Sequence, residues 1–181
     1  MLTVPDPTVV DAPRRTLVIG LVEVPTSEAL QQAATGADAL WLRSATPDQV
    51  AAAVRATGLP VGVTSDDVTA LEELVDAGAV AVESAAEDAL ALAAARGLTV
   101  WCSQTQAQGA LPRGVSETLI VVEGRTGVTV AGVGPAAWGA VVRAVHGGAA
   151  VLRTADVRSV RRVVAVTDRL LDARHRRDQP G

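Results

Sequence analysis

The chain has 181 residues, a formal net charge of −4 and a hydrophobic content of 49%. This length suits one domain with a sizeable core, and the acidic balance excludes a general nucleic-acid-binding protein, which needs a basic face. A single cysteine, Cys102, excludes an internal disulfide framework. Since no leader-like segment and no run of about 18 apolar residues is present, we expect a cytoplasmic protein with no membrane contact.

Short apolar runs alternate with helical patterns through the first half of the chain. Strands are expected at residues 16–24, 39–42, 60–63 and 80–82, with helices at residues 26–35, 46–57, 66–77 and 86–96. Start and stop signals support these boundaries. Thr46-Pro47 begins the second helix, and Gly58 and Gly78 follow the ends of the second and third.

The alternation changes after a fifth strand at residues 98–102. Residues 103–116 are rich in amides and hydroxyls and predict no helix. Two further strand patterns are separated by only five residues, too few for a parallel crossover, so either a helix was lost or the two strands form a hairpin. These strands are expected at residues 118–122 and 128–131, followed by a helix at 135–146, a strand at 149–152 and an amphipathic helix from 157 to about 177.

Eight strand patterns with mostly intervening helices predict an α/β protein, a small (β/α)8 TIM-like barrel with a missing or shortened helix between strands five and seven. An open doubly wound sheet is the alternative, but the first strand lacks the spaced glycines of a dinucleotide site. We expect a loose arm at residues 1–15, one barrel domain at residues 16–177 and a tail at residues 178–181.

Charged residues follow several of the predicted strands. Glu23, Glu83 and Glu123 come after strands one, four and six, at the face where barrel enzymes keep their chemistry. With Arg43, Arg125 and Arg153 they predict a mixed-charge ring for a small polar ligand, or else a closed network of Arg–Glu pairs that needs no ligand. The interspersed arginines argue against a metal site, and we expect no metal and no cofactor.

A second candidate site is a glycine-containing turn before the helix at 135–146. The free amides of Gly132 and Gly134 would receive an anion, with Arg153 as the countercharge. Asp156 stands close to Arg153 in the sequence and joins the candidate ligand-binding residues. A simple tight turn explains the two glycines equally well, and the sequence assigns no catalytic residue.

Several segments match one family's motifs in order. They are residues 20–27 (Gly-Leu-Val-Glu-Val-Pro-Thr-Ser), 36–40 (Gly-Ala-Asp-Ala-Leu), 61–65 (Val-Gly-Val-Thr-Ser), 76–79 (Asp-Ala-Gly-Ala) and 153–157 (Arg-Thr-Ala-Asp-Val). Together they resemble the dihydropteroate synthase family, which is a family of pterin-binding TIM barrels. The resemblance implies a barrel from a family that joins a pterin pyrophosphate to p-aminobenzoate, in folate biosynthesis.

The positions that this resemblance assigns to the pterin pocket have changed. The family's buried Asp and Asn side chains are replaced here by Glu23, Trp41, Thr64, Glu83 and Ser84. The chain has no lysine, and Ala155 stands where the family has its last-strand histidine, although Arg153 and Asp156 remain. Each buried pterin group left unpaired costs about 1–3 kcal/mol. The resemblance therefore implies a degenerate, truncated member without synthase activity.

The resemblance also implies association through the last helix, because dimers of the family form there. An apolar stripe is available on this helix, formed by Val160, Val163, Val164, Thr167, Leu170 and Leu171. We expect a homodimer or a hetero-partner at this helix. The alternative function is a small TIM-barrel enzyme whose Glu/Arg ring binds a polar or phosphate-bearing ligand.

Overall fold

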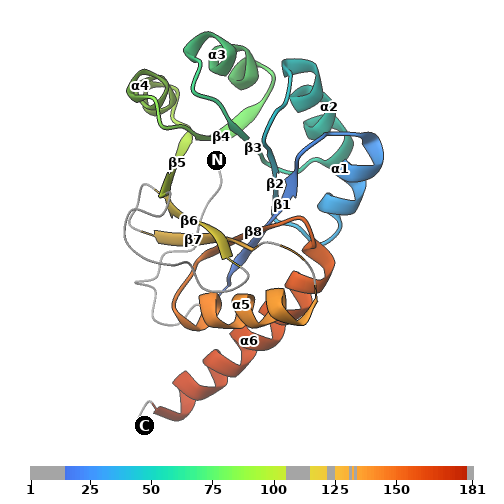
Figure 1. Ribbon diagram of the computed structural model, residues 1–181, viewed down its shortest axis with the longest axis vertical. Coiled ribbons are helices and arrows are strands. Elements are labelled where there is room, and N and C mark those ends of the chain that lie inside the picture. The colour runs from blue at the N-terminus through green and yellow to red at the C-terminus, as the bar shows by residue number, and fades with distance from the viewer. Residues whose placement is uncertain (1–14, 105–114, 122–124, 131, 133, 179–181) are drawn as a thin grey trace.

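The computed structural model describes residues 15–104, 115–121, 125–130, 132 and 134–178 (Figure 1). The strands are β1 Leu17–Val22, β2 Ala39–Leu42, β3 Val61–Thr64, β4 Ala79–Glu83, β5 Thr99–Gln104, β6 Val115–Val121, β7 Arg125–Val130 and β8 Val151–Thr154. The helices are α1 Ser27–Ala34, α2 Pro47–Thr57, α3 Val68–Asp76, α4 Glu87–Ala95, α5 Pro135–His146 and α6 Val157–Asp178. In this part of the chain no helix combines the length and the apolarity that a membrane crossing requires.

The strands follow one another around a curled sheet in chain order, and β8 pairs with β1 to close the ring. All pairs are parallel except those of β6, which runs antiparallel to both β5 and β7. The α/β class with a curled, mainly parallel sheet is therefore confirmed. The open doubly wound alternative is wrong because β1 and β8 are hydrogen-bonded, and a regular (β/α)8 barrel is not formed because β6 is reversed.

A hairpin joins β6 to β7, one of the two arrangements that the sequence left open. Val121 pairs with Arg125 and Leu119 with Gly127, so the two strands run back along each other from a short connection. Between β5 and β7 no helix occurs among the described residues, while residues 105–114 and 122–124 lie outside them. In the described residues, β6 therefore occupies its place in the ring with the opposite direction to that of a regular repeat.

Local capping signals explain why most of the predicted boundaries agree with the observed ones. The Thr46 side chain accepts a hydrogen bond from the Gln49 N–H (3.4 Å), and the Gln49 side chain accepts one from the Thr46 N–H (2.9 Å). This capping box starts α2, and Gly58 ends it in the left-handed conformation with φ +66°. Asp67 caps α3 by accepting a hydrogen bond from the Ala70 N–H at 3.1 Å.

The last strand differs from its predicted range of 149–152. The Ala149 N–H still closes α5 by donating to the Ala144 carbonyl at 2.9 Å, so the strand begins at Val151. Arg153 is consequently an interior residue of β8, which pairs with β1 on one side and with β7 on the other. It does not lie beyond the end of the strand. This shift of two residues decides what Arg153 contacts.

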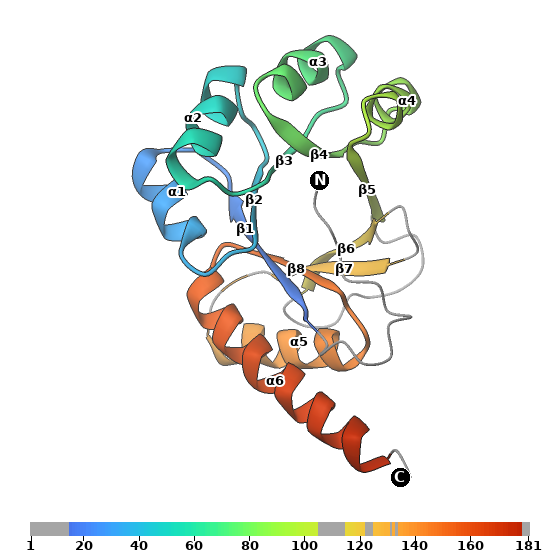
Figure 2. The same ribbon diagram turned by 180° about the vertical axis from the view of Figure 1, so that it is seen from behind.

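Alternate residues of each strand face opposite sides of the sheet and form separate layers. Outward-facing residues pack against α1–α4 on one part of the ring and against α5 and α6 on the other (Figures 1 and 2). Inward-facing residues form a third cluster of Leu17, Ile19, Ala39, Trp41, Ala81, Trp101 and Val151. The interior of the ring is therefore a packed core, as in larger barrels.

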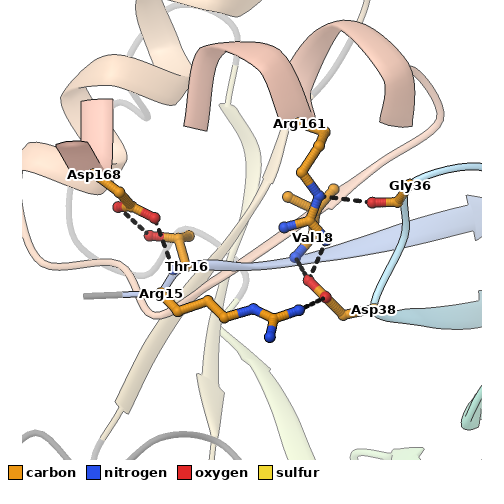
Figure 3. A network of polar contacts seen from close by, with 7 residues as sticks. All are labelled: Arg15, Thr16, Val18, Gly36, Asp38, Arg161 and Asp168. Carbon is orange, nitrogen blue, oxygen red and sulfur yellow. Dashed lines mark hydrogen bonds and ion pairs between the residues drawn. The ribbon is translucent and has the colours of Figure 1, made fainter. Parts of the chain in front are cut away.

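An aspartate fastens α6 to the beginning of the sheet (Figure 3). The Asp38 carboxylate accepts hydrogen bonds from the Val18 N–H (2.9 Å) and from the Arg15 guanidinium (2.7 Å). It also pairs with Arg161 of α6, which donates in turn to the carbonyl of Gly36 at 2.7 Å. One side chain thus joins β1, the connection before β2 and the last helix.

A second aspartate holds the middle of α6. Asp168 accepts hydrogen bonds from both the backbone N–H and the hydroxyl of Thr16, each at 3.0 Å (Figure 3). Asp168 is only 8% exposed and Thr16 only 5%, so this contact satisfies polar groups that are largely withdrawn from solvent. Sequence reasoning missed this contact, although an acidic residue on the otherwise buried face of α6 was its visible signal.

Candidate functional site

Two tryptophan rings fill the interior of the barrel. Trp41 from β2 and Trp101 from β5 have ring centroids 4.6 Å apart and planes inclined by 30°, and both residues are completely buried. The space for Trp41 exists because Gly62 on β3 has no side chain. A Cβ atom at Gly62 would lie 2.3 Å from the nearest Trp41 ring atom. The indole therefore occupies the place that an inward side chain of β3 would take.

Arg153 lies against these rings and is also completely buried. Its Nη1 donates to the Glu83 carboxylate at 2.5 Å, and its Nε donates to the hydroxyl of Thr129 at 3.0 Å. The guanidinium carbon lies 5.2 Å from the centroid of the Trp41 ring, within cation–π range. The positive charge is thus neutralised by a carboxylate and covered by an aromatic ring, so it is not accessible to a ligand from solvent.

Thr64 completes this cluster at the end of β3. The Trp41 indole N–H donates to the Thr64 hydroxyl at 3.0 Å, and that hydroxyl donates to Glu83 at 3.5 Å. The Glu83 carboxylate therefore receives hydrogen bonds from two sides of the barrel. The buried indole N–H of Trp101 has no hydrogen-bond partner among the described residues.

The predicted charged ring divides into a buried pair and an exposed pair. Glu83 and Arg153 form the buried pair, whereas Glu23 and Arg43 form an ion pair of 3.6 Å with side chains that are 61% and 33% exposed. An exposed pair of this kind contributes little to stability. Glu123 lies outside the described residues. Within the described ranges, no three His, Cys, Asp or Glu side chains gather as a metal site would require.

The components of the predicted anion site have separate roles. Gly132 and Gly134 adopt positive φ angles of 76° and 86° before α5, whose N-terminus has no side-chain cap. Arg153, the expected countercharge, is already paired with Glu83. Asp156 accepts a hydrogen bond from the Ser159 N–H at 3.2 Å, so it caps the start of α6.

Asp66 links two neighbouring loops at the carboxyl ends of the strands. Its carboxylate accepts hydrogen bonds from the Ala85 N–H (2.8 Å) and from the Ser84 hydroxyl (2.7 Å). These hydrogen bonds, chiefly the one from the Ala85 N–H, hold the pKa of Asp66 below its ordinary value. The sequence places the start of the third helix at residue 66, whereas in the structure its cap is Asp67.

Three residues of the interior cluster were not singled out from the sequence: Gly62, Trp101 and Thr129. The only available signal was that one of three rare tryptophans lies in the fifth apolar run and that a glycine interrupts the third. Neither observation identifies a contact, because the pairing register between strands sets which residues meet inside a barrel.

The described chain is thus an α/β protein whose curled sheet encloses a packed Trp–Arg–Glu centre. Its fold is that of the dihydropteroate synthases. The enzyme of Thermus thermophilus in complex with 4-aminobenzoate superposes with a TM-score of 0.68 at 18% identity, over 88% of this chain and 95% of that one. The enzyme of Burkholderia cenocepacia in complex with 7,8-dihydropteroate gives 0.63 at 17% identity, over 90% and 94%.

A third similar structure is that of Mycobacterium tuberculosis Rv1207, with a TM-score of 0.69 at 14% identity over 88% of this chain and 92% of that one. No protein-family model matches the chain, and the comparison with curated proteins gives no match either. At these identities the likeness establishes the shared fold. The family resemblance seen in the sequence is confirmed at that level.

Proposed function

We propose that this chain is a non-catalytic protein with a dihydropteroate synthase-like fold, associated with folate biosynthesis through self-association or a protein partner. The observation that carries the proposal is the filled interior. Trp41 stands where the resemblance places a pterin-binding aspartate, and it is completely buried between Trp101 and Arg153. In this role the barrel supports a protein-binding surface and does not enclose a substrate.

The energetics of the interior support a permanent filling. A pterin entering this space would have to displace the indole of Trp41 and separate Arg153 from Glu83. Breaking a buried ion pair by removing one partner costs roughly 3–5 kcal/mol, because the remaining charge is left uncompensated. The exposed Glu23–Arg43 pair is too solvated to offset such a cost.

The synthase reaction tests the non-catalytic half of the proposal. The purified chain is incubated with dihydropterin pyrophosphate and 4-aminobenzoate, and 7,8-dihydropteroate is measured by chromatography, with the Thermus thermophilus enzyme as the positive control. We expect no product above the enzyme-free reaction. Formation of 7,8-dihydropteroate by the chain would overturn the proposal.

Thermal shift measurements test the alternative of a small barrel enzyme with a polar or phosphate-bearing ligand. Pterin, 4-aminobenzoate, inorganic phosphate and magnesium are titrated separately. We expect no saturable shift. A shift that disappears in Arg43→Gln, but persists in the matched surface variant Arg55→Gln, would instead establish a ligand site at the exposed pair.

The surface of α5 and α6 supports the association half of the proposal. Of the five exposed large hydrophobic residues described, four lie on these two helices, namely Trp138, Val142, Val166 and Leu170. The stripe expected from the sequence needs a correction here. Val160, Val164 and Thr167 are buried in the chain itself, while Val163 and Leu171 are partly buried and Leu170 is 66% exposed.

A further inference from the structure

An apolar groove of about 450 Å³ runs between α5 and α6. Its lining residues are Val142, His146, Arg162, Val163, Val166, Thr167, Leu170 and Leu171. The two helices lie side by side, and α6 continues past the end of α5 (Figures 1 and 2). Grooves of this form between two packed helices receive the apolar face of a third helix in many complexes.

The net charge of α6, which forms one side of the groove, is positive. Helix α6 contains seven arginines and three aspartates and has a net charge of +4, with His175 counted as neutral. The rest of the chain contains nine arginines and seventeen acidic residues and has a net charge of −8. Arg162 and His146 line the groove itself, and none of its lining residues is acidic. The helix that contributes most of the groove lining is therefore a basic element of an acidic protein.

We propose that the groove between α5 and α6 binds an amphipathic helix of another protein, with an apolar stripe that is flanked by acidic side chains. The inference rests on the proposed function, and it names the partner that the association surface selects. The apolar stripe of the partner covers Val142, Val166 and Leu170, and its carboxylates meet Arg162 and the other exposed arginines of α6. Charge complementarity of this kind speeds the encounter and excludes partners of the wrong sign.

A second copy of the chain fits this surface less well. A symmetric pair built on α6 would bring the same patch together twice, and thus two helices with a net charge of +4 each. An anionic membrane would match the charge but not the shape, because the apolar side chains line a concavity between two helices. An acidic helix satisfies both the shape and the charge.

The chain contains its own reporter for this site. Trp138 is 42% exposed and lies one helical turn before Val142 on α5, whereas Trp41 and Trp101 are completely buried in the barrel. A ligand that covers the groove changes the environment of Trp138 alone. Its emission is therefore expected to shift to shorter wavelength on binding, without a change in the two buried rings.

The test uses the full chain and a designed helical peptide of leucine, alanine and glutamate that contains no tryptophan. Its twin has lysine in place of every glutamate. We expect saturable binding of the acidic peptide that weakens with added salt, and no binding of the lysine twin. Leu170→Gln is expected to weaken binding about tenfold or more, because the partner no longer buries an apolar side chain at this position. Val24→Gln removes an exposed hydrophobic residue elsewhere, 69% exposed, and is expected to bind as the unchanged chain does.

Three results would overturn the inference: equal binding of the two peptides, no binding of the acidic peptide, or an equal effect of Leu170→Gln and Val24→Gln. Light scattering and flotation with phosphatidylserine vesicles complete the test. A concentration-dependent dimer that Leu170→Gln abolishes would replace the acidic helix by a second copy, and binding to vesicles lost in the same variant would replace it by a membrane. None of these outcomes tests the proposed absence of synthase activity. Only the formation of 7,8-dihydropteroate would contradict that proposal.

Discussion

The contact between Gly62 and Trp41 gives the sharpest test of the filled interior. In Gly62→Ala the new Cβ would lie 2.3 and 2.4 Å from two ring carbons of Trp41, whereas carbon atoms prefer separations of about 3.5–4.0 Å. The indole would have to move by about 1 Å or more. It is held by stacking on Trp101 and by its hydrogen bond to Thr64, so it cannot move freely.

Overpacking of a well-packed core costs about 1–3 kcal/mol, and a weakened hydrogen bond adds about 0.5–1.5 kcal/mol. We therefore expect Gly62→Ala to lower the free energy of unfolding by roughly 2–4 kcal/mol. For a chain of this size this corresponds to a decrease of roughly 5–15 °C in Tm. Urea unfolding followed by far-ultraviolet circular dichroism measures the change, because the substitution itself alters the tryptophan fluorescence.

Gly139→Ala is the matched control, because it makes the same substitution in the interior of α5. The nearest atom to its Cβ would be Nη1 of Arg143 at 3.4 Å, so the change is expected to stabilise the chain by about 0.5–1 kcal/mol. Gly62→Ala combined with Trp41→Leu should cost less than the sum of the two single changes. If Gly62→Ala instead behaves like Gly139→Ala, the described packing of Trp41 is refuted.

Three further predictions concern polar contacts. Glu83→Gln leaves the buried Arg153 without its countercharge and is expected to lower the free energy of unfolding in urea by roughly 3–5 kcal/mol. Glu23→Gln at the exposed pair should change it by less than about 0.5 kcal/mol. Equal effects would contradict the distinction between a buried and an exposed Glu–Arg pair. Asp168→Ala leaves the N–H and the hydroxyl of Thr16 buried and unpaired, and is expected to lower the free energy of unfolding by about 1–3 kcal/mol in the same assay. A decrease below about 0.5 kcal/mol would argue against the contact. Asp66 has a folded-state pKa below the ordinary 3.8, so its stabilising contribution is complete above that pH and is lost as the pH falls through the folded value. The stability difference between the unchanged chain and Asp66→Asn should therefore shrink as the pH falls below the ordinary 3.8, and a difference independent of pH would contradict the lowered pKa.

The resemblance in the sequence and the filled interior are related through single positions. The resemblance assigns Trp41 and Thr64 to positions of the family's pterin pocket, and in this structure the two side chains are hydrogen-bonded to each other. Both residues belong to one internal cluster with Glu83 and Arg153.

The sequence by itself determined the elements and much of their order. Hydrophobic periodicity and caps such as Thr46 and Asp67 are local, so the helices and most strands were predicted near their observed ranges. The spacing between the sixth and seventh strands also limited the choice to a lost helix or a hairpin. The candidate site was predicted only as a set of charged residues near strand ends.

Only the tertiary structure decided which of these residues meet. Glu83 and Arg153 are separated by 70 positions, and their contact depends on the ring closing between β8 and β1. The register that sets Gly62 beside Trp41 is equally invisible in the sequence, because a slip of one residue turns every side chain of a strand to the other face. The chain therefore specifies local conformation directly, whereas the contents of the barrel follow from how the strands pair.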